Sequence, residues 1–126
     1  MIRYGYTTYS TLPAPFAHVA LRCPQTGNTS QETAAQIDTG SDFTVLPGKL
    51  VDELQLQSMG ITQVAGLGGH ISRVGVYRVD VTIRSLPTVR IKAVRNDNEL
   101  FVLLGRDVLN HFRLVLDGPA SSLEIG

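Results

Sequence analysis

The chain has 126 residues, the length of one compact domain, and its 43% hydrophobic and 17% charged residues argue against a disordered polypeptide. Eleven basic residues balance eleven acidic ones, so we expect no nucleic-acid partner. Cys23 is the only cysteine, which excludes an intrachain disulfide and a zinc site built on cysteines. We expect no membrane association and a reduced, cytoplasmic setting, although a chain excised from a longer precursor would look the same.

Most of the chain is predicted to form short β-strands, after an N-terminal segment 1–17 of unassigned role. The predicted strands are 18–23, 33–38, 43–46, 77–84 and 88–95. In 77–84, one face carries Tyr77, Val79, Val81 and Ile83, and the other carries Arg78, Asp80, Thr82 and Arg84. Alternation of this kind is typical of antiparallel strands with one buried face and one solvated face.

Two short helices are predicted, at residues 48–56 and 106–112. The first follows Pro47, and proline suits the first turn of a helix. The apolar residues that share a face are Leu50, Val51 and Leu54 in the first helix, and Val108, Leu109 and Phe112 in the second. The sequence therefore predicts a single, mainly β domain over residues 1–126, with one or two short helices.

Asp38 begins the motif Asp-Thr-Gly in "AAQIDTGSDFTVLP", residues 34–47. Asp and Gly both favour turns, so the tripeptide alone indicates a tight turn after a strand. The runs before and after it are apolar, which predicts that the turn lies in the interior of the fold. A buried carboxylate is costly unless it is hydrogen-bonded or titrated, so Asp38 is a candidate catalytic residue.

Three glycines, Gly66, Gly68 and Gly69, lie between two strand-like arms in residues 64–77. A loop that binds phosphate would lead from a strand into a helix, whereas this segment continues as a strand. The pattern therefore favours a mobile hairpin or a plain structural turn.

A third block, "LFVLLGRDVLNHF" at residues 100–112, carries apolar residues into Gly105, Arg106 and Asp107. It indicates a buried strand whose glycine allows close packing of a neighbour. Arg106 then stands where an arginine could meet a carboxylate of the Asp38 segment.

The three blocks "DTGSDFTVLP", "GLGGHI" and "LLGRDVL", in this order, resemble the catalytic loop, the flap tip and the closing strand and helix of retropepsin-like aspartic peptidases. The resemblance implies a single-lobe acid-protease β-barrel that is active as a twofold dimer on peptide or protein substrates. It implies neither a metal nor a cofactor.

The resemblance also implies roles for particular residues. Asp38 would be the catalytic aspartate, Thr39 would bond to the partner subunit across the twofold axis, and Gly40 would allow close backbone approach. Asp42 would receive the substrate backbone and pair with Arg106, as a bidentate arginine can satisfy a carboxylate. The implied substrate-binding residues are Gly40, Asp42, Gly66, Leu67, Gly68, Gly69, His70 and Ile71, and the implied supports of the site are Ser41, Gly105 and Arg106.

Two positions depart from the retroviral pattern. His70 stands where retroviral members carry an aromatic apolar residue, and simple solvent exposure at a loop tip is favoured over a catalytic role. Ser41 stands where they usually carry alanine, and a hydroxyl donated to the Asp38 carboxylate would lower its pKa. We therefore expect Ser41→Ala to move the acidic limb of the rate profile to higher pH.

Only one Asp-Thr-Gly motif is present, since Asp117-Gly118 is better interpreted as a turn between two strands. A chain of this length cannot hold a second copy of the fold, so the second Asp38 is expected from another subunit of a C2 homodimer. The termini are candidates for the dimer contacts. Two alternatives stay open: a catalytically silent dimeric peptide-binding or scaffold module of the same fold, and an unrelated small β-barrel with a chance motif.

Overall fold

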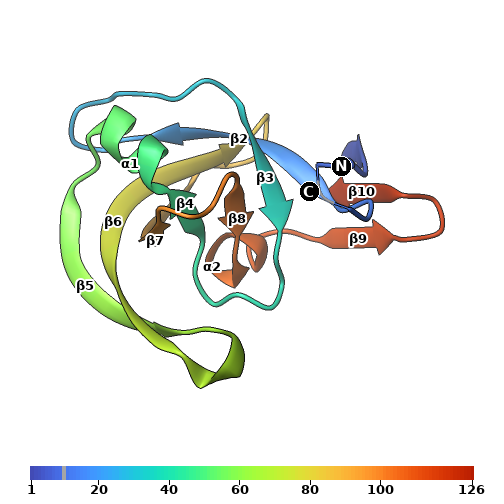
Figure 1. Cartoon of the computed structure of the whole chain (residues 1–126). Coiled ribbons are helices and arrows are strands. Elements are labelled where there is room, and N and C mark those ends of the chain that lie inside the picture. The colour runs from blue at the N-terminus through green and yellow to red at the C-terminus, as the bar shows by residue number, and fades with distance from the viewer. Residues whose placement is uncertain (10) are drawn as a thin grey trace.

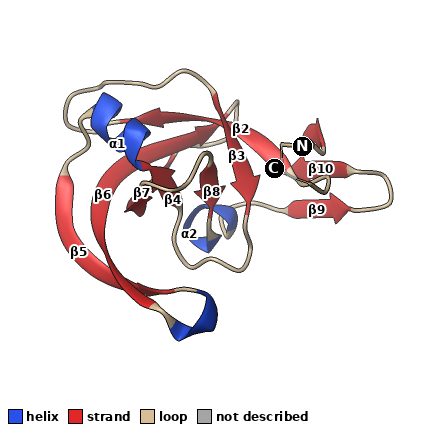
Figure 2. Cartoon of the chain, in the orientation of Figure 1, coloured by secondary structure: helices blue, strands red, loops and turns tan. Residues whose placement is uncertain are grey.

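The computed structural model describes residues 1–9 and 11–126 and is mainly β (Figures 1 and 2). The strands are β1 (Ile2–Gly5), β2 (Phe16–Arg22), β3 (Thr33–Ile37), β4 (Val45–Pro47), β5 (Ser58–Ala65), β6 (Ile71–Ile83), β7 (Val89–Asn96), β8 (Val102–Leu104), β9 (Leu114–Asp117) and β10 (Ser122–Ile125). The helices are α1 (Gly48–Leu54), the 3₁₀ turn η1 (Leu67–Gly69) and α2 (Arg106–Leu109). These bounds confirm the mainly β class.

The larger sheet closes on itself as a barrel. Its strand order is β2-β3-β8-β4-β7-β6-β5, and an additional pairing between β2 and β6 joins the ring. Strand β5 stays outside this ring, paired only with the first part of the long strand β6. Figure 1 shows this β5–β6 hairpin curving away from the barrel and ending at a tip below it.

Alternating side chains build the barrel core as the sequence predicts. In β6, Val79, Val81 and Ile83 are buried, and in β7, Val89, Ile91 and Ala93 are buried. The two strands pair antiparallel, with Val79 opposite Ile91. Burial of these apolar side chains on one face of each strand supplies the main driving force for folding.

Asp80 is an exception to the predicted pattern, because it lies on the face expected to be solvated and is nevertheless buried. Arg90, opposite it on β7, donates to both carboxylate oxygens at 2.7 and 3.2 Å. Arg22 adds an ion pair at 3.5 Å. The hydrogen bond from Arg90 is the first cause that holds the pKa of the Asp80 carboxyl below its ordinary value.

The strands next to the Asp38 segment differ slightly from their predicted bounds. The strand expected at 18–23 runs from Phe16 to Arg22, and the one expected at 33–38 ends at Ile37. The strand expected at 43–46 begins only at Val45, because the backbone before it forms hydrogen bonds to the region around α2.

The helices and the third block also differ from expectation. Helix α1 ends at Leu54, followed by a left-handed Gln55, and α2 ends at Leu109. Beyond α2, Phe112 still packs against the core, but its N–H donates to the Leu109 carbonyl, three residues back, so the chain tightens into turns. The buried strand expected before Gly105 begins only at Val102, and Leu100, the first residue of the third block, is 84% exposed.

Both termini enter a separate three-stranded sheet with the order β1-β10-β9. Strand β1 pairs with β10 of the same chain, with Ile2 opposite Ile125 and Gly5 opposite Ser122. The predicted turn at Asp117-Gly118 joins β9 to β10, and Figure 1 shows this hairpin projecting from the barrel. The N-terminal segment thus supplies one edge strand of a sheet that forms within a single chain. Among the described residues, no helix is long and apolar enough to cross a membrane.

Candidate active site

Asp38 lies directly after β3, in a loop that runs to Thr44. Its backbone N–H donates to the Leu104 carbonyl of β8 at 3.0 Å, which extends the parallel pairing of the two strands by one residue. Its carboxylate accepts a hydrogen bond from the N–H of Gly40 at 3.2 Å. Asp38 is half-buried, and Thr39 and Gly40 are exposed, so the predicted interior turn lies at the surface of the single chain.

Arg106, the first residue of α2, ties this loop to the helix. Its guanidinium donates to the Thr39 carbonyl at 2.7 Å and forms an ion pair with Asp42, the pair expected from the sequence. Its backbone N–H donates to the Ser41 carbonyl at 2.9 Å. The Asp42 side chain is 73% exposed, so Arg106 orients a solvated carboxylate and does not neutralise a buried one.

Thr44 and Asp107 make a second connection between loop and helix, which the sequence interpretation missed. The Thr44 hydroxyl donates to Asp107 at 2.7 Å and accepts from the N–H of Gly105 at 3.1 Å. The Thr44 N–H donates to the other Asp107 oxygen at 2.9 Å. Thr44 is fully buried, and the signal for it was a lone hydroxyl residue in the apolar run "FTVL".

Gly105, the residue before α2, must be a glycine because the backbone of the Asp38 loop passes very close to it. A Cβ atom there would lie 2.5 Å from the carbonyl carbon of Phe43 and 2.9 Å from the Thr44 nitrogen. Both atoms belong to the backbone and cannot swing away. The close approach predicted from this glycine is therefore confirmed.

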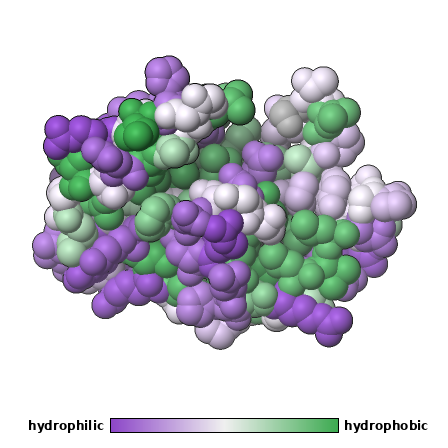
Figure 3. All heavy atoms as spheres, turned by 90° about the horizontal axis from the view of Figure 1, so that it is seen from below, coloured by the Kyte–Doolittle hydropathy of each residue, from purple (hydrophilic) through white to green (hydrophobic). Residues whose placement is uncertain are grey.

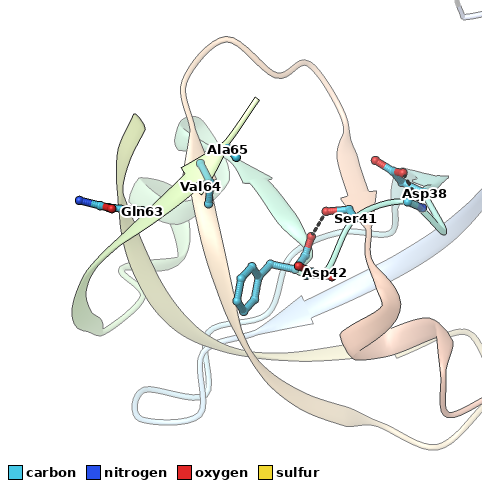
Figure 4. A pocket seen from close by; sticks show the side chains of 8 residues that line it. Asp38, Ser41, Asp42, Gln63, Val64 and Ala65 are labelled. Atoms are coloured by element: carbon cyan, nitrogen blue, oxygen red, sulfur yellow. Dashed lines mark hydrogen bonds between the residues drawn. The ribbon is translucent and has the colours of Figure 1, made fainter. Parts of the chain in front are cut away.

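Ser41 does not donate to Asp38. Its hydroxyl donates to the Phe43 carbonyl at 2.6 Å, within the loop (Figure 4). The hydrogen bond expected from Ser41 to the Asp38 carboxylate is therefore not formed, because the one hydroxyl proton is already donated to Phe43. The shift expected for the acidic limb of the pH–rate profile in Ser41→Ala depended on that hydrogen bond, so the structure gives no reason to expect it.

A groove of about 490 Å³ separates the Asp38 loop from the β5–β6 hairpin. It is lined by Asp38, Gly40, Ser41, Asp42, Phe43, Gln63, Val64 and Ala65. In Figure 4, Asp38 and Asp42 come from the loop, while Gln63 on β5 points away from them. Phe43, Gln63, Val64 and Ala65 were not predicted as site residues. Phe43 belongs to the Asp38 loop, and Gln63, Val64 and Ala65 come from the stem of the hairpin, whereas the prediction concentrated on the glycines of its tip.

The predicted tip residues form a narrow turn that extends into solvent. The Gly66 N–H donates to the His70 carbonyl at 2.7 Å, and Gly68 and Gly69 have φ values of 76° and 77°, which favour glycine. His70 is exposed, as favoured for a loop tip. Leu67 is 99% exposed and Ile71 is exposed as well, so the tip carries apolar side chains with nothing of their own chain to cover them.

Among the described residues, no group of three or more His, Cys, Asp or Glu side chains is arranged to hold a metal ion. The acidic side chains that line the groove between loop and hairpin are Asp38 and Asp42, and the second is paired with Arg106. Within the described part of the chain, Asp38 is thus the carboxylate that faces this groove without a cationic partner.

Comparison with known proteins gives the family. The family model described as retroviral aspartyl protease matches residues 14–117. A search of curated proteins found no significant match. Among solved structures, the protease of equine infectious anaemia virus (EIAV), complexed with the inhibitor HBY-793, matches with a TM-score of 0.63 and 20% identity, over 83% of this chain and 93% of that one.

A bacterial structure matches over nearly the whole chain. It is described as a retropepsin-like aspartic protease from Rickettsia conorii, and the TM-score is 0.64 at 14% identity, over 99% of this chain and 97% of that one. The simian foamy virus protease matches at 0.54 with 12% identity, over 76% and 92%. At these identities the structures establish the fold, and the family model establishes membership. The chain belongs to the retroviral aspartyl protease family and has the retropepsin-like fold of single-domain aspartic peptidases.

Proposed function

We propose that residues 1–126 act as one peptidase domain, an aspartic endopeptidase whose active site is shared between two copies of the chain. The observation that carries this proposal is the half-buried Asp38 carboxylate at the surface of one chain, facing a groove under a long hairpin. Family membership supports peptide hydrolysis as the reaction class. A twofold axis beside Asp38 would supply the second carboxylate.

The chemistry follows from two carboxylates held close together. Two such groups resist simultaneous ionisation, so the pair of Asp38 residues would share one proton. The ionised member would take a proton from a water molecule as its oxygen attacks the scissile carbonyl carbon. The protonated member would donate to the carbonyl oxygen, and the tetrahedral intermediate would then break the C–N bond as a proton passes to the leaving amine. The apparent pKa values would belong to the pair.

The anchoring of the loop supports this role. Arg106 and Asp107 hold the loop from the α2 side, which fixes the direction of Asp38 before substrate arrives. Thr39 and Gly40 remain exposed on the other side, where Thr39 would bond to the partner subunit and Gly40 would admit the substrate backbone. Asp42, oriented by Arg106, would receive a backbone N–H of the peptide.

The β5–β6 hairpin would act as a flap over an extended peptide. Peptide recognition would then resemble strand addition, with backbone hydrogen bonds for affinity and side-chain pockets for selectivity. Exposed Leu67 and Ile71 at the tip supply apolar surface that a bound peptide or the partner's hairpin would cover. The tip residues that would take part are Gly66, Leu67, Gly68, Gly69, His70 and Ile71.

The test compares cleavage of a denatured protein mixture by the native chain and by Asp38→Asn at pH ~4–7, with and without a statine-type inhibitor. We expect cleavage by the native chain only, abolished by the inhibitor. Equal cleavage by both chains would reject Asp38 as the catalyst. A folded native dimer without any cleavage would favour the silent peptide-binding module. In a dilution series, the specific activity of a shared site should fall as dimers dissociate.

A further inference from the structure

A second pocket, here called the side pocket, adjoins the groove between the Asp38 loop and the hairpin. Its volume is about 390 Å³, and Asp38 lines both it and the groove. Its apolar wall includes Val45, Val74, Val94 and Leu103, one residue from each of β4, β6, β7 and β8. Pockets of ~300–1,000 Å³ hold whole drug-sized ligands, so the side pocket has room for one long side chain of a bound peptide.

Glu99, in the turn between β7 and β8, brings a carboxylate to this pocket. The residue is half-buried, and within the described part of the chain its carboxylate has no hydrogen-bond donor and no ion-pair partner. Its oxygens are not sealed from solvent. Partial burial removes water from a charge, and here nothing of the chain replaces that water. The carboxylate is therefore available to a cation that enters the pocket.

Arg95 also lines the side pocket, but other carboxylates already use its charge. Its guanidinium donates to Asp97 at 2.8 Å and to the two oxygens of Asp52 at 2.7 and 3.1 Å. One cation thus binds two carboxylates, neither of which is Glu99. The charges around the pocket leave an excess of negative charge, which favours a cationic occupant over an acidic one.

The turn that carries Glu99 is held at both ends. Before it, Arg95 connects the end of β7 to Asp52 of α1. After it, the ring of Phe101 stacks on the ring of Tyr9, with centroids 5.0 Å apart, so the N-terminal segment packs against the residues that lead into β8. Binding to a turn whose backbone is already fixed costs less conformational entropy than binding to a flexible one.

We propose that the side pocket selects a lysine or arginine side chain of the peptide and that Glu99 determines this preference. The methylene groups of either side chain would lie on the apolar wall, and the cation would meet the Glu99 carboxylate. Figure 3, seen from the side of the hairpin tip, shows apolar and hydrophilic side chains next to one another on this face. The inference rests on the proposed function, which places an extended peptide beside Asp38.

The positions of the cut bonds test this preference. The native chain and Glu99→Gln digest the same denatured protein mixture, and mass spectrometry identifies the residues around each cut bond. For the native chain, we expect Lys and Arg to be enriched at one fixed position relative to that bond.

Two peptides that differ only at this position then measure the contribution of Glu99. On the peptide with Lys, Glu99→Gln should lower kcat/KM about tenfold. On the peptide with norleucine, which keeps the methylene groups and lacks the cation, the change should stay below about twofold. Glu53→Gln makes the same substitution at an exposed carboxylate of α1 and should leave both rates unchanged.

Charge reversal and salt test the electrostatic origin of the preference. Glu99→Lys should prefer a peptide with Glu at the selected position over the peptide with Lys. Because Glu99 is only half-buried, the preference of the native chain for Lys over norleucine should shrink as salt rises to ~1 M. A preference that survives both changes would overturn the assignment to Glu99.

Binding without turnover separates this inference from the proposed function. Immobilised Asp38→Asn is exposed to a random decapeptide library, beside the double variant that also carries Glu99→Gln, and the retained peptides are sequenced. Retention of Lys and Arg peptides that requires Glu99 would support the inference even if the native chain cleaved nothing. Cleavage without a basic preference, or with the same preference in Glu99→Gln, would overturn the inference alone. A chain that neither cleaves nor retains any peptide would overturn both.

Discussion

The buried hydroxyl of Thr44 should be a main support of the Asp38 loop, and Thr44→Val tests this. Valine keeps the shape of the side chain and removes only the hydroxyl. The change takes a donor from the Asp107 carboxylate, whose bond to Thr44 is 2.7 Å long, and leaves the N–H of Gly105 without its acceptor at 3.1 Å. A hydrogen bond to a charged group contributes ~1.5–3 kcal/mol, and an unsatisfied buried N–H costs ~1–3 kcal/mol.

The extra methyl group of valine offsets about 1 kcal/mol of this loss, so we expect the free energy of unfolding to fall by ~2–4 kcal/mol. The measurement is urea unfolding followed by far-UV circular dichroism at one fixed protein concentration, since a dimer unfolds in a concentration-dependent way. Thr44→Ser is the control, because it keeps the hydroxyl and should lose only about 1 kcal/mol. If serine were as damaging as valine, packing and not hydrogen bonding would hold the loop.

Three further changes test other supports of the fold and site. Gly105→Ala should lower the free energy of unfolding by more than ~2 kcal/mol, since its Cβ would meet backbone at 2.5 Å, whereas Gly118→Ala, with open space around it, should be near neutral in the same urea titration. Arg90→Met removes the hydrogen bonds that are the first cause of the lowered Asp80 pKa; because that pKa is depressed in the folded state, the lost stability should be largest above pH ~4, the ordinary pKa of the unfolded carboxyl, and should disappear as pH falls through the lower folded-state pKa. Unfolding at neutral and acidic pH would show this, and a loss independent of pH would contradict it. Arg106→Lys should lower kcat/KM by about tenfold while changing stability by less than ~1 kcal/mol, because lysine cannot hold the loop carbonyl and the exposed carboxylate together; a large stability loss in urea would contradict this.

The barrel strands were predictable because their burial follows local alternation. Strands β6 and β7 show this, since each has one row of apolar residues that the core buries. The predictions missed effects that depend on contacts between distant segments. Asp80 is buried because Arg90 and Arg22 reach it from neighbouring strands, and α2 is short because the chain turns to place Phe112 against the core.

The candidate site was predictable only as a set of blocks. Asp38, the glycine-rich hairpin and Arg106 are far apart in the chain, and each alone fits an ordinary structural role: a turn, a hairpin tip and the end of a buried strand. The Arg106–Asp42 pair was predicted from the family resemblance, and the structure contains it because the cation and the carboxylate meet between loop and helix. The acceptor of the Ser41 hydroxyl could not be predicted from the sequence. The Phe43 carbonyl accepts its hydrogen bond, and only the folded loop brings that carbonyl close enough.

The hydrogen bonds of the Asp38 loop are unevenly distributed. The side of the loop that supports the fold therefore differs from the side that would take part in the proposed catalysis. On the α2 side, Asp107, Arg106 and Leu104 hold the loop through bonds of 2.7 to 3.0 Å. On the other side, Thr39 and Gly40 are exposed. If the site is shared as proposed, each chain would thus fold its half of it without a partner. Loss of the buried Thr44–Asp107 hydrogen bonds on the α2 side should therefore reduce stability and activity together, whereas Asp38→Asn should remove activity from a chain that folds as before.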